Sequence, residues 1–355
     1  MKKWIAGVAL LACAAFAAPG SGLVSKKLEL TSAGPLAFGP PGILFVGDST
    51  GAGLIAIDTG DRAANKGAGN IELKGINQKI AAALGTSPDQ ITIQDLAVNP
   101  VSRNIYLSVA RGTTPVILKL DVAGKITELS LDNIAHARVS LPDAPAADAK
   151  DGRGNSKRME TITDLGYVDG RVFIAGLSNE EFASSLRSIP YPFQPAAKAS
   201  SIEIFHGAHG RFETNAPVRT FTSYTVANKP HLLAAYTCTP LVTIPLSELT
   251  PGNKVKGKTI AELGNRNRPL DMIVYNKDGK DYILMANSSR GVMKLPAAKL
   301  ETYEAITAQT EKQGVPYETL AELKGVQQLD RYDDKSAVML MVDGGSMDLR
   351  TVALP

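Results

Sequence analysis

Six segments of the chain repeat one pattern of apolar and polar positions. An alternating strand is followed by a turn of Gly, Asp or Asn, and then by a more apolar strand that ends in polar residues and by a third strand. Sets of turn-bounded strands repeated at about 40–50 residues are typical of a β-propeller. The pattern predicts an all-β propeller of six blades, with seven as the alternative count because insertions disturb the spacing. We expect the strand around Phe45 and the strand at 338–342 to belong to different blades that meet where the ring closes. The copies occupy 34–60, 93–129, 162–181 continued at 200–213, 231–249, 269–296 and 326–354.

The insertions between these copies differ in character. Residues 75–85 and 297–314 carry apolar residues at helical spacing, so each predicts a short helix. Residues 142–157 are polar and contain Pro and Gly, which indicates a loop. The prolines of 185–199 argue against a continuous strand or helix in that segment. Since no segment reads as a linker between domains, we expect a single propeller domain over 18–355.

The first 17 residues have the pattern of a secretory signal peptide. Lys2 and Lys3 precede an apolar run from Trp4, and Ala15–Ala17 form an A-x-A cleavage site. No later segment approaches the roughly 18 apolar residues that a membrane helix requires. We expect cleavage after Ala17 and a periplasmic or secreted protein. Acylation of Cys13 as a lipoprotein is the less favoured outcome, because the apolar run continues beyond it.

Charge and cysteine content narrow the range of partners. Loss of Lys2 and Lys3 would lower the formal net charge from +3 to +1, so the mature chain is nearly neutral and its charge does not indicate binding to nucleic acid or anionic membranes. Loss of Cys13 would leave Cys238 as the single cysteine, which excludes an internal disulfide. The remaining partners are a small molecule or a protein, and we expect a monomer.

Propeller topology assigns the loops to two faces. Successive strands of a blade alternate in direction, so loops that enter strand one and loops that join strands two and three share a face, called here the top face. Asp95, Asp164 and Asp271 fall at equivalent positions near the start of strand one, where the sixth repeat has Gln328. We expect a ligand-binding funnel where these polar residues converge. Its candidate residues are Asp95, Glu160, Asp164, Asn179, Glu180, Cys238, Asn265, Arg266, Arg268, Asp271, Asn287 and Arg290.

The three aspartates admit a structural and a functional interpretation. Taken singly, each is best interpreted as a carboxylate that accepts backbone N–H groups of the neighbouring blade, because buried polar groups must be paired. Taken together, the acids, amides and arginines favour a site. Like charges at one channel raise one another's pKa unless a cation or a guanidinium intervenes. Ca²⁺ prefers oxygen ligands, but we favour pairing with Arg266, Arg268 or Arg290, since the GNRNRP segment places two guanidiniums beside Asp271.

The histidines and the cysteine offer weaker signals. His206, His209 and His231 are all expected on the bottom face, where they could bind zinc or copper. We favour a turn-stabilising role, because an H-x-x-H spacing in a glycine turn is weakly diagnostic. Cys238 is expected beside the funnel without a histidine on its face, so it lacks the base that a nucleophile needs. The sequence contains no haem attachment motif, nucleophile elbow, P-loop or dinucleotide fingerprint.

The segments LAFGPPGILFVGDSTGAGLIAID and LAVNPVSRNIYLSVA resemble secreted propellers of the NHL, YVTN, strictosidine synthase-like and quinoprotein amine dehydrogenase β-like group. GLSNEEFASSLRSIPYPFQP and ELGNRNRPLDMI are similar to segments of exported bacterial proteins without an assigned function. The resemblance implies a propeller and no particular activity. Six-bladed calcium-dependent lactonases and esterases are similar in holding a metal in the channel with Glu, Asn and Asp, and the residues of suitable chemistry here are Glu160, Asp164, Asp271 and Asn287.

Three functions remain open from the sequence. The leading hypothesis is a propeller that binds a small ligand or a partner through its polar top-face funnel. The alternatives are a calcium-dependent hydrolase that uses the channel mouth and a partner-docking scaffold without a small-molecule site. A hydrolase requires a metal or an acid–base pair in the funnel, whereas a scaffold requires a broad exposed apolar patch. The sequence leaves enzymatic activity and the identity of the ligand open.

Overall fold

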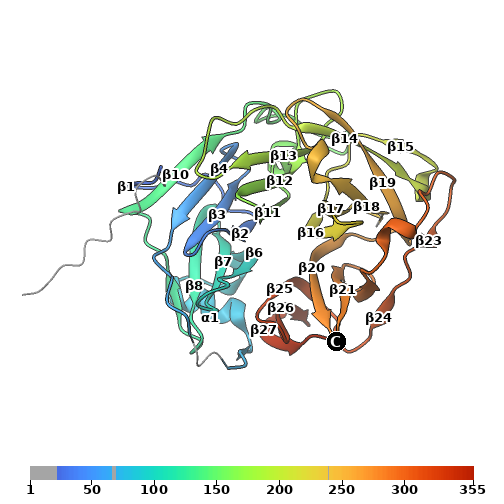
Figure 1. Cartoon of the computed structure of the whole chain (residues 1–355). Helices are drawn as coiled ribbons and strands as arrows, with labels where there is room; N and C mark the ends of the chain where they lie inside the picture. The colour runs from blue at the N-terminus through green and yellow to red at the C-terminus, as the bar shows by residue number, and fades with distance from the viewer. Residues whose placement is uncertain (1–21, 66–68, 239) are drawn as a thin grey trace, which may run out of the picture.

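The computed structural model describes residues 22–65, 69–238 and 240–355, and these form a six-bladed β-propeller. The predicted signal peptide and Cys13 lie outside the described residues. Figure 1 shows the blades arranged radially around a central axis. The helix expected at 75–85 is confirmed as α1 (Ile76–Ala83). Within the described residues, no helix is both long and apolar enough to cross a membrane.

Each blade is an antiparallel sheet whose innermost strand lines the central axis. The blades are numbered here by the order of their innermost strands in the sequence. Blades 1 and 6 take their outer strands from elsewhere in the chain. Blade 1 contains β2 (Leu36–Phe38), β3 (Ile43–Asp48), β4 (Gly53–Asp58), β10 (Ile134–Ser140) and β1 (Val24–Lys26); blade 2 contains β6 (Ile91–Val98), β7 (Ile105–Arg111), β8 (Thr114–Leu120) and β9 (Ile126–Glu128); blade 6 contains β25 (Val326–Arg331), β26 (Ser336–Asp343), β27 (Ser346–Ala353) and β5 (Glu72–Leu73).

Blades 3 and 4 are joined at their outer edges, because β14 and β19 pair in parallel. Blade 3 contains β11 (Asp164–Val168), β12 (Arg171–Leu177), β13 (Ser184–Pro190) and β14 (Ser200–His206), with β15 (Arg211–Glu213) paired to β14; blade 4 contains β16 (Thr220–Val226), β17 (Lys229–Ala235), β18 (Pro240–Pro245), β19 (Lys254–Leu263) and β23 (Lys312–Gly314); blade 5 contains β20 (Pro269–Lys277), β21 (Lys280–Asn287), β22 (Gly291–Pro296) and β24 (Glu318–Leu320).

The blades do not follow one another around the ring in sequence order. The inner strand β2 of blade 1 contacts β6 of blade 2 and β11 of blade 3, whereas β25 of blade 6 contacts β20 and β6. Blade 1 therefore lies between blades 2 and 3, and blade 2 closes the ring against blade 6 (Figure 1). The expectation that the Phe45 strand and strand 338–342 meet at ring closure is wrong. Phe45 packs against Ile174 of blade 3, and Val338 packs against Ile105 of blade 2.

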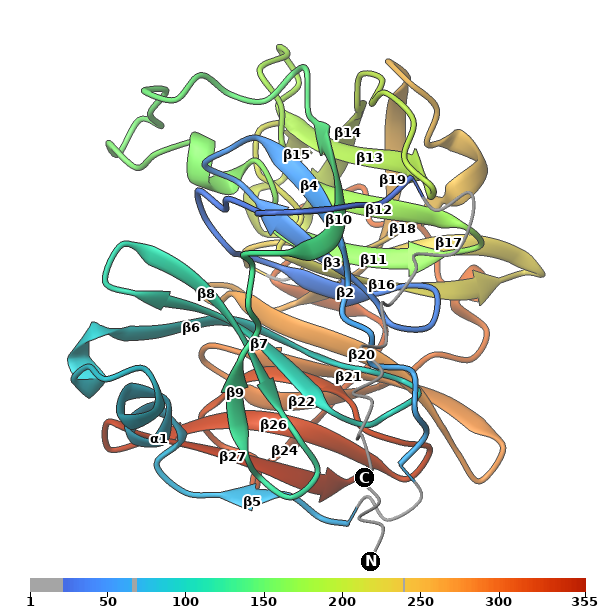
Figure 2. The ribbon, with the colours of Figure 1, turned by 90° about the vertical axis from the view of Figure 1, so that its left-hand side faces the viewer.

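This order arises because the chain leaves blade 1 before that blade is complete. After β4 it adds β5 to the edge of blade 6, passes through α1 and builds blade 2. It then returns as β10, which pairs with β4 and completes blade 1 on its outer side (Figure 2). The hydrophobic repeat predicts strands but carries no information on which blades become neighbours, so this crossover could not be read from it.

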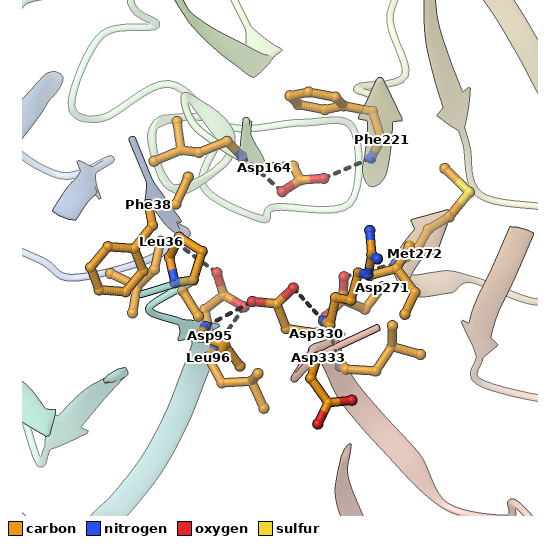
Figure 3. Close-up of a pocket in the computed structure, with 18 of the residues that line it drawn as sticks. Leu36, Phe38, Asp95, Leu96, Asp164, Phe221, Asp271, Met272, Asp330 and Asp333 are labelled. Carbon is orange, nitrogen blue, oxygen red and sulfur yellow. Dashed lines mark hydrogen bonds between the residues drawn. The ribbon is translucent and has the colours of Figure 1, made fainter. Parts of the chain in front are cut away.

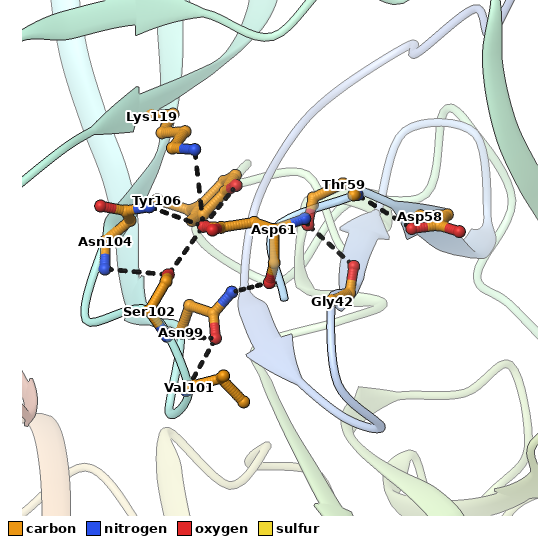
Figure 4. Close-up of polar contacts among 11 residues, drawn as sticks. Gly42, Asp58, Thr59, Asp61, Asn99, Val101, Ser102, Asn104, Tyr106 and Lys119 are labelled. Carbon is orange, nitrogen blue, oxygen red and sulfur yellow. Dashed lines mark hydrogen bonds and ion pairs between the residues drawn. The ribbon is translucent and has the colours of Figure 1, made fainter. Parts of the chain in front are cut away.

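A buried carboxylate joins blade 1 to blade 2 at the point where the chain departs. Figure 4 shows Asp61, just beyond β4, surrounded by donors of blade 2. Its Oδ2 accepts hydrogen bonds from Ser102 Oγ at 2.8 Å, Asn104 Nδ2 at 2.9 Å and the Tyr106 hydroxyl at 3.1 Å. The ammonium group of Lys119 lies 3.7 Å away. Burial raises the pKa of Asp61, but these hydrogen bonds and the lysine outweigh it, so the pKa lies below its usual value.

The apolar core is divided among the contacts between blades. In one cluster, Ile76 and Ile80 of α1 pack with Leu107 of blade 2 and Leu340 of blade 6. The other clusters likewise lie between neighbouring sheets, for example Leu186 of blade 3 with Leu232 of blade 4. Each sheet buries both faces, which is why the second strands read as nearly continuous apolar runs.

The segment 185–199 holds no continuous strand or helix, as its prolines predict, but its first residues pair with β12 and belong to strand β13, which the sequence did not reveal. The helix expected at 297–314 is wrong. The segment 297–314 forms one 3-10 turn at Leu300–Thr302 and strand β23 instead of a helix. The backbone of this segment forms hydrogen bonds with neighbouring strands, for example from Ile306 N to Thr259 O at 2.9 Å. Tertiary hydrogen bonding has overridden the local helical propensity.

Candidate functional site

The central channel holds four aspartates on the inner strands. Figure 3 shows Asp95, Asp164, Asp271 and Asp330 directed into the space between the blades. The cavity there has a volume of about 470 Å³, and inner strands of all six blades line it. Asp95, Asp164 and Asp271 therefore converge on one channel, as the repeat predicts. Asp330 lies two positions further along its strand than Gln328, which occupies the equivalent register in blade 6.

Each aspartate uses its two oxygens in the same way. One oxygen accepts the N–H of the next residue, as between Asp164 and Leu165 at 2.8 Å. The other accepts an N–H of the inner strand of the neighbouring blade. These second bonds are Leu36 N to Asp95 at 2.7 Å, Phe221 N to Asp164 at 2.6 Å, Leu329 N to Asp271 at 2.8 Å and Val98 N to Asp330 at 2.7 Å. The structural interpretation of the strand-start aspartates is confirmed: they join four of the blade contacts around the ring.

The channel raises the pKa of all four carboxyl groups. Burial raises the pKa of Asp164 to about 7 and that of Asp330 to about 6, although backbone N–H bonds oppose the rise. For Asp95 and Asp271, burial again dominates, and the negative charges of the other channel aspartates raise the pKa well above its usual value. The protein encloses these groups, yet each residue keeps some surface open to the channel cavity.

The prediction that Arg266, Arg268 or Arg290 pairs with the channel aspartates is wrong. Among the residues that the structure describes, Asp271 accepts bonds only from the backbone N–H groups of Met272 and Leu329. The guanidinium of Arg290 instead donates to the carbonyl oxygen of Asn265 at 3.1 Å. Arg268 lies near Glu160 and Arg219, whose charges act on its pKa. Asp95, Asp164 and Asp271 are therefore stabilised by backbone N–H groups, whereas the positive charge of Arg331 also lowers the pKa of Asp330.

A second cavity, the top funnel, lies on the top side of the aspartates and has a volume of about 520 Å³. Glu160 and Arg219 form an ion pair across 2.5 Å within it. Burial lowers the pKa of Arg268, and the positive charge of Arg219 lowers it further, while Glu160 opposes this. The residues that line the funnel include Ser32, Thr50, Gln94, Met159, Glu160, Thr163, Arg219, Arg268, Leu270 and Gln328.

Five of the twelve predicted site residues line one of these two cavities: Asp95, Glu160, Asp164, Arg268 and Asp271. Seven do not, namely Asn179, Glu180, Cys238, Asn265, Arg266, Asn287 and Arg290. Glu180 pairs with Lys198 on an exposed loop at 2.7 Å.

Many polar groups of the GNRNRP segment form hydrogen bonds within their own loop. The amide of Asn267 donates to the carbonyl oxygens of Gly264 and Asn265, and its oxygen accepts from Asn287 Nδ2 at 2.7 Å. Asn287 in turn accepts the N–H of Arg290 at 3.1 Å. These bonds stabilise a turn whose backbone groups have no partners in a β-sheet. The loop then presents Arg268 to the funnel.

The metal set inferred from the lactonase resemblance is not assembled. Within the described residues, Glu160, Asp164 and Asp271 do not form a group close enough to share one ion. Glu160 pairs with Arg219, and Asn287 is bonded to Asn267.

The positions of the histidines and the cysteine also require correction. His206 and His209 lie on the top face with Cys238, whereas His231 lies in the inner half of blade 4 at the bottom end of β17. The unrecognised strand β13 explains the error. It makes the His206 strand the fourth of its blade, so that strand ends at the top. Cys238 consequently has two histidines on its face.

Sequence reasoning missed Arg219 and Asp330. Arg219 immediately precedes the inner strand of blade 4, just as Arg268 precedes that of blade 5. This shared position was a usable signal. Asp330 was missed because it lies deeper in the channel than the repeat position on which the other aspartates fall.

Comparisons with known proteins assign neither a family nor an activity to this chain. No protein-family model matches the sequence, and no curated protein matches it significantly. Similar solved structures include a PQQ-bound aldose sugar dehydrogenase from Streptomyces coelicolor, with 11% identity, a TM-score of 0.34, and coverage of 94% of this chain and 99% of the other. A glucose dehydrogenase has 13% identity, a TM-score of 0.39, and coverage of 94% and 100%. Drosophila Plexin A in complex with Semaphorin 1b has 10% identity, a TM-score of 0.40, and coverage of 94% and 87%. Likenesses this low do not assign an activity.

Proposed function

We propose that this chain is an exported β-propeller that binds a small anionic ligand in the top funnel. The observation that carries the proposal is a pair of neighbouring arginines, Arg219 and Arg268, beside a single carboxylate, Glu160, which forms its ion pair with Arg219. Among the described residues, the Arg268 guanidinium makes no hydrogen bond or ion pair, although it lies beside another positive charge. An incoming anion would satisfy its donors.

The chemistry of the funnel suits a carboxylate or a phosphate group. A guanidinium presents its N–H donors in a planar fork that matches two oxygens of such a group. Thr50, Gln94 and Gln328 line the same cavity and offer neutral hydrogen-bonding groups for the rest of a ligand. The volume of about 520 Å³ lies within the range of small-molecule sites.

The other two functions have less support. The hydrolase alternative requires a metal or an acid–base pair in the funnel, and the residues expected to hold Ca²⁺ do not converge there. A docking scaffold requires an apolar patch. Among the described residues, the large apolar side chains that are exposed are Val24, Met159 and Phe212, which come from separate segments. Export to the periplasm or outside the cell stays part of the proposal and rests on the signal-peptide pattern.

The proposal is tested by anion binding to matched variants. Calorimetric titration with citrate, inorganic phosphate and sulfate should detect at least one probe that binds the wild-type protein. Arg268→Gln should raise the dissociation constant of that probe at least about 10-fold, because a charge-assisted hydrogen bond is lost. Arg266→Gln is the control, since Arg266 belongs to the same loop but does not line the funnel. Equal weakening by both substitutions, or by neither, would contradict the assignment.

A further inference from the structure

A cluster of potential metal ligands lies on the top face, outside the channel and the funnel. His206 ends β14, His209 closes the 3-10 turn that follows, and Cys238 lies in the turn between β17 and β18. One ligand atom from each of the three residues can be chosen so that all three atoms lie within 4.8 Å of one another. Blades 3 and 4 thus supply two imidazoles and a thiol to one point.

The orientation of the imidazoles is set by one carboxylate. Glu213 on β15 receives His206 Nδ1 on one oxygen at 2.8 Å and His209 Nδ1 on the other at 2.7 Å. The two rings lie against each other with centroids 4.0 Å apart. Because Nδ1 of each ring is occupied by Glu213, Nε2 is the nitrogen left to bind a ligand. A carboxylate that holds Nδ1 in this way is the usual outer partner of a metal-bound histidine.

His206 carries the strongest indication that something is bound. The residue is only 3% exposed, and its Nε2 atom has no hydrogen-bond partner. An unpaired polar nitrogen in a buried position is costly and rare. When Nδ1–H donates to Glu213, Nε2 carries a lone pair that points away from that carboxylate. This lone pair can be satisfied by a metal ion or by a hydrogen-bond donor. The thiol of Cys238 does not hydrogen-bond to it.

The backbone holds Cys238 in an unusual conformation at this point. Its φ of +65° lies in the left-handed region, which non-glycine residues seldom adopt. The N–H of Cys238 donates to the carbonyl oxygen of Asn267 at 2.7 Å, so the loop that presents Arg268 also fixes this turn. A strained backbone that the surroundings hold in place is common where a side chain must be aimed.

We propose that His206, His209 and Cys238 bind one thiophilic transition-metal ion, such as Zn²⁺, with Glu213 as the positioning residue for both histidines. Tetrahedral Zn²⁺ bonds of about 2.0–2.3 Å place ligand atoms about 3.3–3.8 Å apart, so atoms that already lie within 4.8 Å of one another are close to that spacing. Binding would release the thiol proton and leave a thiolate bound to the metal. Two histidines and one cysteine leave a fourth position open, and His209 and Cys238 are partly exposed there.

The test uses the full chain, freed of metal with a chelator and dialysed against Zn²⁺. We expect inductively coupled plasma mass spectrometry to find one zinc ion per chain. When Co²⁺ replaces Zn²⁺, the protein should show a thiolate-to-cobalt charge-transfer absorption. Cys238→Ser should abolish that absorption. Glu213→Gln should keep the absorption but weaken the affinity about 10- to 100-fold, as expected for a residue that acts through the ligands.

Controls separate this site from adventitious binding and from misfolding. His231→Ala removes a histidine at the bottom of blade 4 and should leave stoichiometry and affinity unchanged. His209→Ala weakens zinc binding but should remain folded by circular dichroism, because the His209 side chain is 42% exposed. The proposal is overturned if the wild-type protein binds no zinc, if Cys238→Ser binds it as tightly as the wild type, or if Cys238 is alkylated equally fast with and without zinc.

Discussion

The channel aspartates predict an unusual dependence of stability on pH, and Asp164→Asn isolates one of them. A carboxyl group whose pKa is raised by folding binds a proton more tightly in the native state than in the unfolded state. Its contribution is fully retained at low pH and is lost as the pH rises towards the native pKa, so stability falls with rising pH. For Asp164 this window extends from about 4, the value of an exposed Asp, to about 7.

The magnitude follows from the same pKa. About two pKa units separate pH 5 from a native pKa of about 7, and each unit corresponds to about 1.4 kcal/mol. Ionisation of Asp164 would therefore remove up to about 3 kcal/mol between pH 5 and pH 8. Because Asp164 keeps some surface open to the channel cavity, solvent screening reduces this cost, and we expect about 1–2 kcal/mol.

Asp164→Asn cannot ionise, and its single acceptor oxygen satisfies only one of the two N–H groups of Leu165 and Phe221. The variant should be less stable than the wild type at pH 5 by about 1–3 kcal/mol, the cost of an unpaired buried donor. That difference should shrink at pH 8 by about 1–2 kcal/mol, because only the wild type then carries the ionised group.

Urea unfolding at pH 5 and pH 8, followed by far-ultraviolet circular dichroism, measures both changes. Trp4 is the only tryptophan and lies in the predicted signal peptide, so tryptophan fluorescence is no substitute. Asp148→Asn, on an exposed loop, is the matched control and should show the wild-type pH dependence. The reasoning is refuted if the stability difference between Asp164→Asn and the wild type is the same at both pH values, or widens at pH 8.

Two further predictions concern the rest of the chain. Asp61→Asn should lower the free energy of unfolding by about 1–3 kcal/mol at pH 7, as judged by urea midpoints, because it weakens the contact between blades 1 and 2. Since the native pKa of Asp61 is lowered, its contribution is present above pH 4 and lost on further acidification, and an unchanged midpoint at pH 7 would contradict the role assigned to it. Mass spectrometry of the exported protein should find an unacylated N-terminus at Ala18; a lipid on Cys13 would show that the protein is membrane-anchored instead.

Much of the candidate site was readable because it repeats. Asp95, Asp164 and Asp271 occupy one position of the repeat, and rotation about the propeller axis brings repeated positions together. The role of each aspartate as a partner for the neighbouring strand followed from the same symmetry. Their lack of arginine partners did not, since the GNRNRP loop uses its polar groups on Asn287 and on its own carbonyls. Side-chain partners within a loop depend on its turn geometry, which the order of the residues alone does not specify.

One unrecognised strand had a larger effect than any single residue. The segment SSLRSIP carries polar residues and ends in proline, yet it forms β13 because β12 offers it a complete ladder of backbone partners. Missing it reversed the direction assigned to the next strand and moved His206 and His209 to the wrong face. Each strand reverses the direction of the chain, so one missed strand changes the face assigned to every residue that follows it in the blade. The two histidines were therefore expected on the face opposite Cys238, which lies about thirty residues further along the chain.

The sequence by itself indicated most of the strands and their turns and favoured six blades, because alternation and turn residues act over a few neighbouring positions. It also determined the convergence of the aspartates, since that follows from repetition. Only the tertiary structure decided the ring order in which blade 1 lies between blades 2 and 3, the pairing of Arg219 with Glu160, and the meeting of two histidines with a cysteine. These features depend on contacts between residues far apart in the chain. Such contacts are chosen by which apolar faces and backbone edges fit together when the whole ring closes, and no local pattern records that choice.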